Sequence, residues 1–295
     1  MASNFFKRRT LGDVIFSIII NVFIIFVIVI TLYPFIFIAS ASISDSGAVG
    51  RMEVWLLPKG INFNAYQRVL KDDQLLTSYK NTIWYVFVGT AINLVMTTTM
   101  AYPLSRRRFQ GRRFIMIAVT FTMFFSGGII PSFILVRNLG MINTRWALVI
   151  PSAISTYNLI VTRSFFESIP ESLHEMATID GAGEFRIFIQ LILPLSMPIL
   201  ATMVLFYAVR HWNTYFNAML YLSKESLYPL QLFLRKILLI YEANNMMLDV
   251  RIDKNDLSRT IRYATIMITT LPIICVYPFV QKYFVKGVMI GAVKG

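Results

Sequence analysis

The sequence predicts an all-α protein whose helices cross a membrane six times. Hydrophobic residues make up 56% of the 295 residues and charged residues only 15%, which is typical of a chain that lies partly in hydrocarbon. The apolar residues gather into runs near the roughly 20 residues that cross a bilayer. Arginine and lysine cluster beside these runs, as signals for membrane orientation do. The net charge of +13 therefore does not indicate a nucleic-acid partner.

The first expected span runs from Val14 to Ser40 and follows a basic cluster at residues 7–9. An apolar run of this length exceeds the roughly 7 to 15 residues of a signal-peptide core. We therefore predict an uncleaved helix, with residues 1–13 as a cytoplasmic tail. Pro34 is expected to kink the outer end of this helix.

The second and third expected spans are Tyr79 to Leu104 and Phe114 to Val136. The loop between them, RRRFQGRR at residues 106–113, has five arginines and no acid, so it is predicted to lie in the cytoplasm. The third span contains FFSGGIIP at residues 124–131. Its glycines and proline either break the helix within the membrane or let neighbouring helices approach closely.

Three further spans complete one transmembrane domain over residues 14–285, followed by a cytoplasmic tail at 286–295. These spans are Trp146 to Phe166, Pro194 to Leu220 and Tyr263 to Val285.

The longest connection, residues 220–259, is expected on the outer face. Within it, LQLFLRKILLIY at residues 230–241 is apolar but short and carries Arg235 and Lys236 at its centre. We predict an amphipathic helix lying on the membrane surface, because a segment of this length and charge is unsuited to crossing.

A polar segment, EMATIDGAGEFRIFIQLILP at residues 175–194, separates the fourth and fifth spans. Pro170 and Glu171 just before it are typical of a helix start, and Asp180-Gly181 predicts a turn. Counting spans from a cytoplasmic N-terminus puts residues 168–194 on the same side as the arginine loop. The sequence thus predicts a cytoplasmic helix–turn–helix.

This segment resembles the EAA loop of binding-protein-dependent ABC importer permeases. The family pattern is E-A-A, three residues, Gly, nine residues, Ile, one residue, Leu-Pro; here Met176 replaces an Ala and Leu191 replaces the Ile, and both remain apolar. FSGGIIP, LGMINTRWALVIP and HWNTYFNAMLYL resemble the subgroup that imports oligo- and polysaccharide fragments. That subgroup is related more distantly to the smaller permease of the maltose importer. Within the subgroup, the chain looks particularly similar to a permease subunit of a bacterial alginate importer. The matching residues are Glu175, Ala177, Asp180, Gly181, Ala182, Phe188, Leu193 and Pro194.

The resemblance implies a type I ABC importer permease bundle of six transmembrane helices in the bacterial inner membrane. The chain would form half of a pore with a second, homologous permease subunit. Two ATP-binding cassette subunits would dock the EAA loop and carry ATP and Mg, and an extracytoplasmic solute-binding protein would deliver an oligosaccharide. The chain itself has no phosphate-binding G-x-x-x-x-G-K-[ST] loop, so we expect ATP to bind another subunit and no cofactor to bind this chain. The sequence shows neither a nucleophile–base–acid set nor ligands at metal spacing, so we expect no catalysis and no metal site on it.

Polar and aromatic residues within the spans are candidates for a sugar pathway, because sugars are held by hydrogen bonds and by aromatic rings. Arg210 or His211 would complement an acidic cargo such as alginate or pectin fragments. Alternatively, these two residues reach the outer interface, where Trp212 would belong to an aromatic belt. The candidates are Tyr157, Asn158, Tyr207, Arg210, His211, Trp212 and Asn213.

An ion-coupled secondary transporter of small solutes is the main alternative. Such proteins normally carry ionisable residues deep in the bundle and are built from two related halves, and the sequence shows neither feature. A membrane enzyme would need a catalytic constellation. The sequence offers His174 beside Glu175 without a second ligand at metal spacing, which favours a surface residue.

Overall fold

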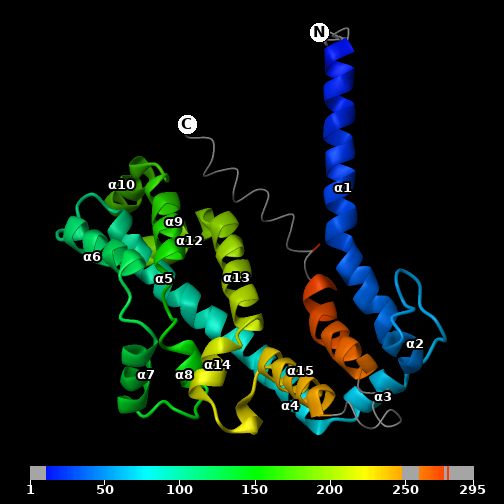
Figure 1. The fold of residues 1–295 in the computed structure, drawn as a ribbon. Helices are drawn as coiled ribbons and strands as arrows, with labels where there is room; N and C mark the ends of the chain where they lie inside the picture. Colours follow the sequence, from blue (N-terminus) through cyan, green and yellow to red (C-terminus); the bar gives the residue numbers. More distant parts are fainter. Residues whose placement is uncertain (1–10, 248–258, 276–277, 279–295) are drawn as a thin grey trace. The chain divides into compact units, whose positions relative to one another are not determined.

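The computed structural model describes residues 11–247, 259–275 and 278, and every regular element in these residues is helical. The predicted all-α class is thereby confirmed. The chain divides into two compact units, residues 1–71 with 238–268 and residues 72–237 with 269–295. Figure 1 labels the helices of both. The predicted C-terminal tail, most of the N-terminal tail and part of the sixth span lie outside the described residues.

The first unit is organised around α1, Leu11–Ser42, which continues through Pro34 and bends in its second half (Figure 1). Its most apolar window has a mean hydropathy of 3.1, as a membrane-spanning helix requires. Phe37 of α1 meets Tyr263 of the helix at residues 259–275 edge to face, with ring centroids 5.6 Å apart. The end of α1 therefore packs against the start of the last described helix.

Two short helices, α2 (Ser46–Gly50) and α3 (Asn64–Leu70), follow α1. The Asp45 carboxylate caps α2 by accepting from the backbone N–H of Gly47 at 3.0 Å, as an N-cap aspartate does. The loop after α2 is held to α1 because the Ser40 hydroxyl donates to the Leu56 carbonyl at 2.7 Å. Residues 43–63 are thus an ordered surface segment.

The second unit contains one long helix built from α4 (Asp73–Trp84), a π-helical turn η1 (Tyr85–Gly89) and α5 (Thr90–Ser105). This helix of 33 residues includes the whole second predicted span. The remaining elements are α6 (Arg112–Phe124), α7 (Ile129–Asn138), α8 (Trp146–Val149), α9 (Thr156–Glu167), α10 (Glu171–Ile179), α11 (Glu184–Ile187), η2 (Phe188–Ile192), α12 (Leu193–Leu195), α13 (Met197–Trp212), α14 (Phe216–Tyr221), η3 (Glu225–Leu227) and α15 (Leu230–Met247). The division between the units falls within α15, whose residues from 238 onward belong to the first unit.

The third predicted span is broken, which decides between the two possibilities that its glycines left open. Helices α6 and α7 meet at 116°. Gly128 between them has φ +84°, a left-handed conformation that glycine adopts at little cost. The break separates two helices that are each too short to cross a bilayer alone.

The fourth and fifth predicted spans are also divided. Residues 150–155 separate α8 from α9, beginning where Pro151 disfavours a continuing helix. The segment 184–195 meets α13 at 81°, and Pro198 lies in the first turn of α13. By length and composition, the described residues thus hold two helices able to cross a membrane, or up to four if each bent pair is one span.

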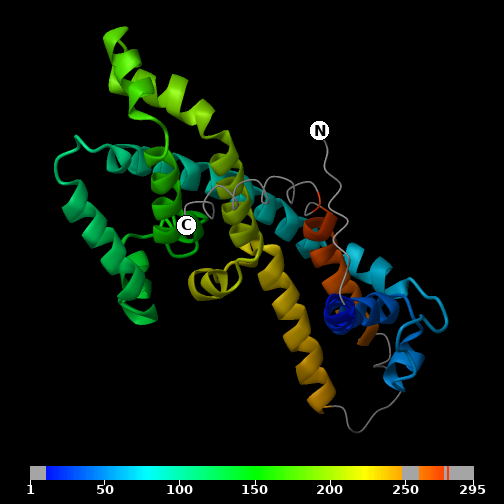
Figure 2. The same cartoon turned by 90° about the horizontal axis from the view of Figure 1, so that it is seen from above.

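Polar side chains join α5 to α13 and to the connection at residues 150–155, and Figure 2 shows α13 crossing the long helix. The Asn93 amide donates to the Ser152 carbonyl at 2.7 Å, and its oxygen lies 2.7 Å from His211 Nε2. The hydroxyls of Thr97 and Tyr207 are 2.7 Å apart. Since all four side chains are buried, these bonds satisfy polar groups inside the bundle.

The loop before α15 is tied to α4 and η1 by polar side chains. The Asn81 amide donates to the Ser226 carbonyl at 2.8 Å, and the Tyr85 hydroxyl donates to the Leu227 carbonyl at 3.0 Å. Helix α15 continues beyond the predicted 230–241 as far as Met247. Its placement on a membrane surface stays a prediction.

Candidate coupling site

The predicted helix–turn–helix is present. Helix α10 begins directly after Pro170 and ends at Ile179, and α11 begins at Glu184. Figure 1 shows α10 at one end of the second unit, with α7 and α14 at the other. The acidic first residue of α10, Glu171, complements the positive end of the helix dipole.

A six-residue hydrogen-bonded turn fixes the end of α10. The Gly181 N–H donates to the Thr178 carbonyl and the Ala182 N–H donates to the Ala177 carbonyl, both at 3.0 Å. These bonds form a Schellman motif, in which the residue at the Gly181 position is left-handed, and Gly181 has φ +78°. Ala177 and Ala182, the motif's apolar pair, pack against one hydrophobic cluster. The spacing of the alanines and glycine in the EAA pattern thus has a local physical cause.

The outward face of the segment is apolar and exposed. Helix α10 has no buried residue. Met176 is 53% exposed, Ile179 84% and Phe185 of α11 75%. Met176 and Ile179 are three residues apart and so lie on one side of α10, and exposed apolar side chains that gather on one face are typical of an interaction site.

The inward face fastens the segment to the bundle. Ile187, Phe188 and Ile192 are buried in a cluster with Leu159 and Phe166 of α9. The cluster also includes Ala101 and Leu104 of α5, and Leu193 packs against it. A displacement of α10 and α11 must therefore move α5 and α9 or break contact with them.

Two polar links connect the segment to the end of α5. The Tyr102 hydroxyl donates to Glu184 Oε2 at 2.6 Å, and His174 Nε2 lies 3.2 Å from the same oxygen. Arg108 reaches Glu175 at 3.8 Å, and both side chains are largely exposed, so this pair contributes little.

Glu184 and Tyr102 were not among the predicted site residues. The sequence offered one indication of a role for Glu184, because an acidic residue at the first position of a helix, here α11, complements the helix dipole. Its partner lies 82 positions away in the sequence.

The predicted pathway residues fall into two groups. Asn158, Tyr207 and His211 are buried within the unit, and the last two hydrogen-bond to α5 as described. Gly89 makes room for His211, because a Cβ at Gly89 would lie 2.5 Å from the imidazole. The other residues reach a surface of this chain: Tyr157, Arg210 and Asn213 are exposed and Trp212 is half-buried.

No metal centre is formed in the described part of the chain, where no three His, Cys, Asp or Glu side chains group as ligands. His174 instead faces Glu184.

Comparison with known proteins identifies the architecture. Residues 94–290 match the family of binding-protein-dependent transport system inner membrane components. The chain belongs to this family. The permease is 39% identical over 282 residues to the polygalacturonan/rhamnogalacturonan transport system permease protein YtcP of Bacillus subtilis (strain 168), covering 95% of this chain and 99% of that relative. It is 41% identical over 266 residues to protein LplC of the same organism, covering 90% of each.

A solved structure shares the fold over nearly the whole chain. A chain from a bacterial ABC transporter involved in the import of the acidic polysaccharide alginate has a TM-score of 0.84 and 38% sequence identity, covering 96% of this permease and 100% of that chain. The predicted type I ABC permease fold and the resemblance to carbohydrate permeases are therefore confirmed. The alternative of an ion-coupled secondary transporter receives no support.

Proposed function

We propose that this permease forms half of the translocation pathway of an ATP-driven importer for acidic oligosaccharides. The similarity to permeases for two kinds of polyanionic polysaccharide, galacturonan-type polymers and alginate, carries this proposal. An extracytoplasmic binding protein delivers the oligosaccharide, and a second permease subunit completes the pathway. ATP and Mg bind two ATPase subunits, and this chain performs no catalysis.

The helix–turn–helix transmits force from an ATPase subunit. Met176 and Ile179 enter an apolar groove of that subunit, and Glu175 beside them supplies a directional charge contact. Ala177, Asp180, Gly181 and Ala182 form the rigid end of α10. Phe188 and Leu193 anchor the segment in the bundle, where Pro194 follows them in α12. A stiff element packed at both ends suits a two-state coupling role.

Topology follows from this role. Residues 168–194 and the arginine loop face the cytoplasm, together with both termini, and residues 220–259 face outward.

The exposed pathway candidates contact cargo, whereas the buried ones support them. Arg210 offers a guanidinium for sugar carboxylates, and Tyr157 and Asn213 offer an aromatic face and an amide. Asn158, Tyr207 and His211 hold the helices that carry these groups, and Trp212, which is half-buried, belongs to the supporting group.

The decisive experiment is reconstitution of the whole complex in proteoliposomes with its binding protein. We expect ATP-dependent uptake of trigalacturonate, stimulated by the binding protein, and none driven by a proton or sodium gradient alone. Uptake by a gradient without ATP would contradict the proposal. An Arg210→Ala variant that imports trigalacturonate at an unchanged rate would remove Arg210 from the pathway.

A further inference from the structure

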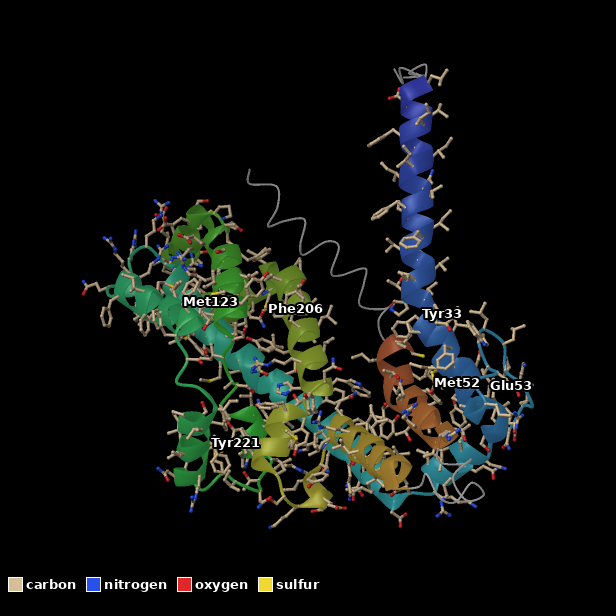
Figure 3. All side chains as sticks on the ribbon, in the orientation of Figure 1. Tyr33, Met52, Glu53, Met123, Phe206 and Tyr221 are labelled. Carbon is tan, nitrogen blue, oxygen red and sulfur yellow. The ribbon has the colours of Figure 1, made fainter. Side chains whose placement is uncertain are left out.

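A cavity lies in the first unit, at the end of α1 that leads into the ordered segment 43–63. We call it the aromatic–arginine pocket and define it by Tyr33, Phe37, Trp55, Arg259, Arg262 and Tyr263. Its volume is about 430 Å³, in the lower part of the roughly 300 to 1,000 Å³ of small-molecule sites. Figure 3 shows Tyr33 on α1 and Met52, which also lines the pocket, on the loop after α2.

Aromatic rings make up much of the wall of this pocket. Phe37 and Tyr263 are fixed edge to face, and Tyr33 stacks on Phe37 with centroids 6.3 Å apart. Trp55 is 67% exposed, so its indole is open to a ligand. Rings held by one another present pre-formed apolar faces, on which the C–H face of a sugar ring can rest.

Two guanidiniums complete the wall. Arg262 lies over the Tyr263 ring at 4.9 Å and donates one hydrogen bond to the Tyr263 hydroxyl at 3.0 Å. That bond uses one of the five N–H donors of the Arg262 guanidinium, so the others remain to bind a ligand carboxylate. Within the described residues, neither Arg262 nor Arg259 has a carboxylate partner. A ligand carboxylate would therefore meet unneutralised positive charge.

The acidic residue nearest to the pocket in the sequence does not oppose such a ligand. Glu53 has its pKa held below its usual value, chiefly because Arg51 donates a hydrogen bond to it at 2.6 Å. Lys59 adds a second positive charge 3.8 Å from the same carboxylate group. The Glu53 charge is thus already balanced by two cations of its own segment.

The backbone beside the pocket is strained. Met52 has φ +56° although it is not glycine, and its side chain is 84% exposed. Such conformations are unfavourable for residues other than glycine, and they cluster at active sites and ligand-binding sites. This observation is independent of the rings and the charges.

We propose that the aromatic–arginine pocket binds one uronate unit of an acidic oligosaccharide, apart from the translocation pathway. The carboxylate is bound by Arg259 and Arg262, and the apolar face of the sugar ring lies against Trp55 and Tyr33. This inference rests on the proposed function, from which it takes the acidic cargo. In the proposed topology the pocket opens on the outer side, where it would hold an arriving chain before import.

Direct binding to the intact complex tests the proposal. The complex is placed in phosphatidylcholine nanodiscs without binding protein, and tryptophan fluorescence is followed as trigalacturonate is added. We expect a saturable change that is lost in Trp55→Phe and absent with maltotriose. Arg259→Gln and Arg262→Gln should each raise the half-saturating concentration about tenfold. Arg262→Lys should raise it less, because lysine keeps the charge but loses the fork.

Arg68→Gln is the matched control, since Arg68 is an exposed arginine of the same unit outside the pocket; it should leave binding and basal ATPase activity unchanged. Co-purification of all subunits establishes that each variant assembles. No Trp55-dependent signal, or equal effects of Arg68→Gln and the two pocket variants, would overturn the proposal. Nanodiscs containing phosphatidylglycerol test an anionic lipid as the occupant, and competitive loss of the signal there would also overturn it. ATP-driven uptake measured in parallel separates this outcome from failure of the proposed function.

Discussion

Helices α2 and α10 end in the same hydrogen-bonded turn but place different residues in its left-handed position. In α2, the Met52 N–H donates to the Val49 carbonyl at 3.1 Å and the Glu53 N–H donates to the Ala48 carbonyl at 3.0 Å. In α10, Gly181 and Ala182 make the equivalent bonds. Methionine thus does on α2 what glycine does on α10.

The two helices differ in the stabilising contacts that can offset the conformational cost of a non-glycine residue at this position. A non-glycine residue in this conformation costs about 1 to 2 kcal/mol. Around α2, Ala48 and Val54 are buried in a core with Ala41, and Asp45 caps the other end. Helix α10 has no buried residue and no side-chain cap. Since α10 has little with which to offset a strained end, glycine at 181 keeps its turn formed.

Replacing Gly181 by proline should have the largest effect. Proline cannot reach φ +78°, and it lacks the N–H that donates to the Thr178 carbonyl. We expect a local cost of about 3 kcal/mol or more and loss of ATP-driven trigalacturonate uptake in proteoliposomes.

The control for this prediction is Gly183→Ala. Gly183 has φ −74° and open space around it, so alanine fits and uptake should persist. Full transport by Gly181→Pro would contradict the coupling role of α10.

Replacing Gly181 by methionine, the residue at the equivalent position of α2, should have the next largest effect. Gly181→Met would meet no neighbour within 4 Å of its Cβ, so the backbone conformation alone sets its cost, about 1 to 2 kcal/mol. Hydrogen exchange of the α10 amides in the assembled complex should accelerate roughly 5- to 30-fold, the factor that corresponds to this cost. Unchanged exchange would show that space, and not conformation, selects glycine here.

Removing the hydrogen bond between Tyr102 and Glu184 should have a smaller effect. Because α10, unlike α2, has no buried residue and His174 of α10 lies 3.2 Å from Glu184, we expect Glu184→Ala to loosen α10. It leaves the buried Tyr102 hydroxyl without its acceptor, at a cost of about 1 kcal/mol. Thermal unfolding of the purified complex measures this cost. A Tyr102→Phe, Glu184→Ala double variant that sums the two single effects would argue against coupling between the residues.

The sequence predicted the coupling segment well because its signals are local. Pro170, Glu171 and Asp180-Gly181 lie within the segment they shape, and the boundaries of α10 followed from them. The link from Tyr102 to Glu184 could not be predicted, because it depends on how α5 packs against α11. The same limit applied to Tyr207 and His211, whose burial against α5 depends on helix packing. Met52 gave no signal at all, since methionine is uncommon in a left-handed turn.

The reverse swap, Met52→Gly, should have the smallest effect and the opposite sign. Glycine removes about 1 to 2 kcal/mol of strain but loses about 0.5 to 1 kcal/mol in conformational entropy on folding. The net stabilisation should be about 0.5 kcal/mol, visible as a slight rise in the unfolding temperature of the complex. Trigalacturonate binding should weaken if the Met52 side chain contributes to the wall of the aromatic–arginine pocket. Greater stability with weaker binding would show that α2 retains its strained end for the ligand, and a destabilised Met52→Gly variant would refute the assignment of strain to this residue.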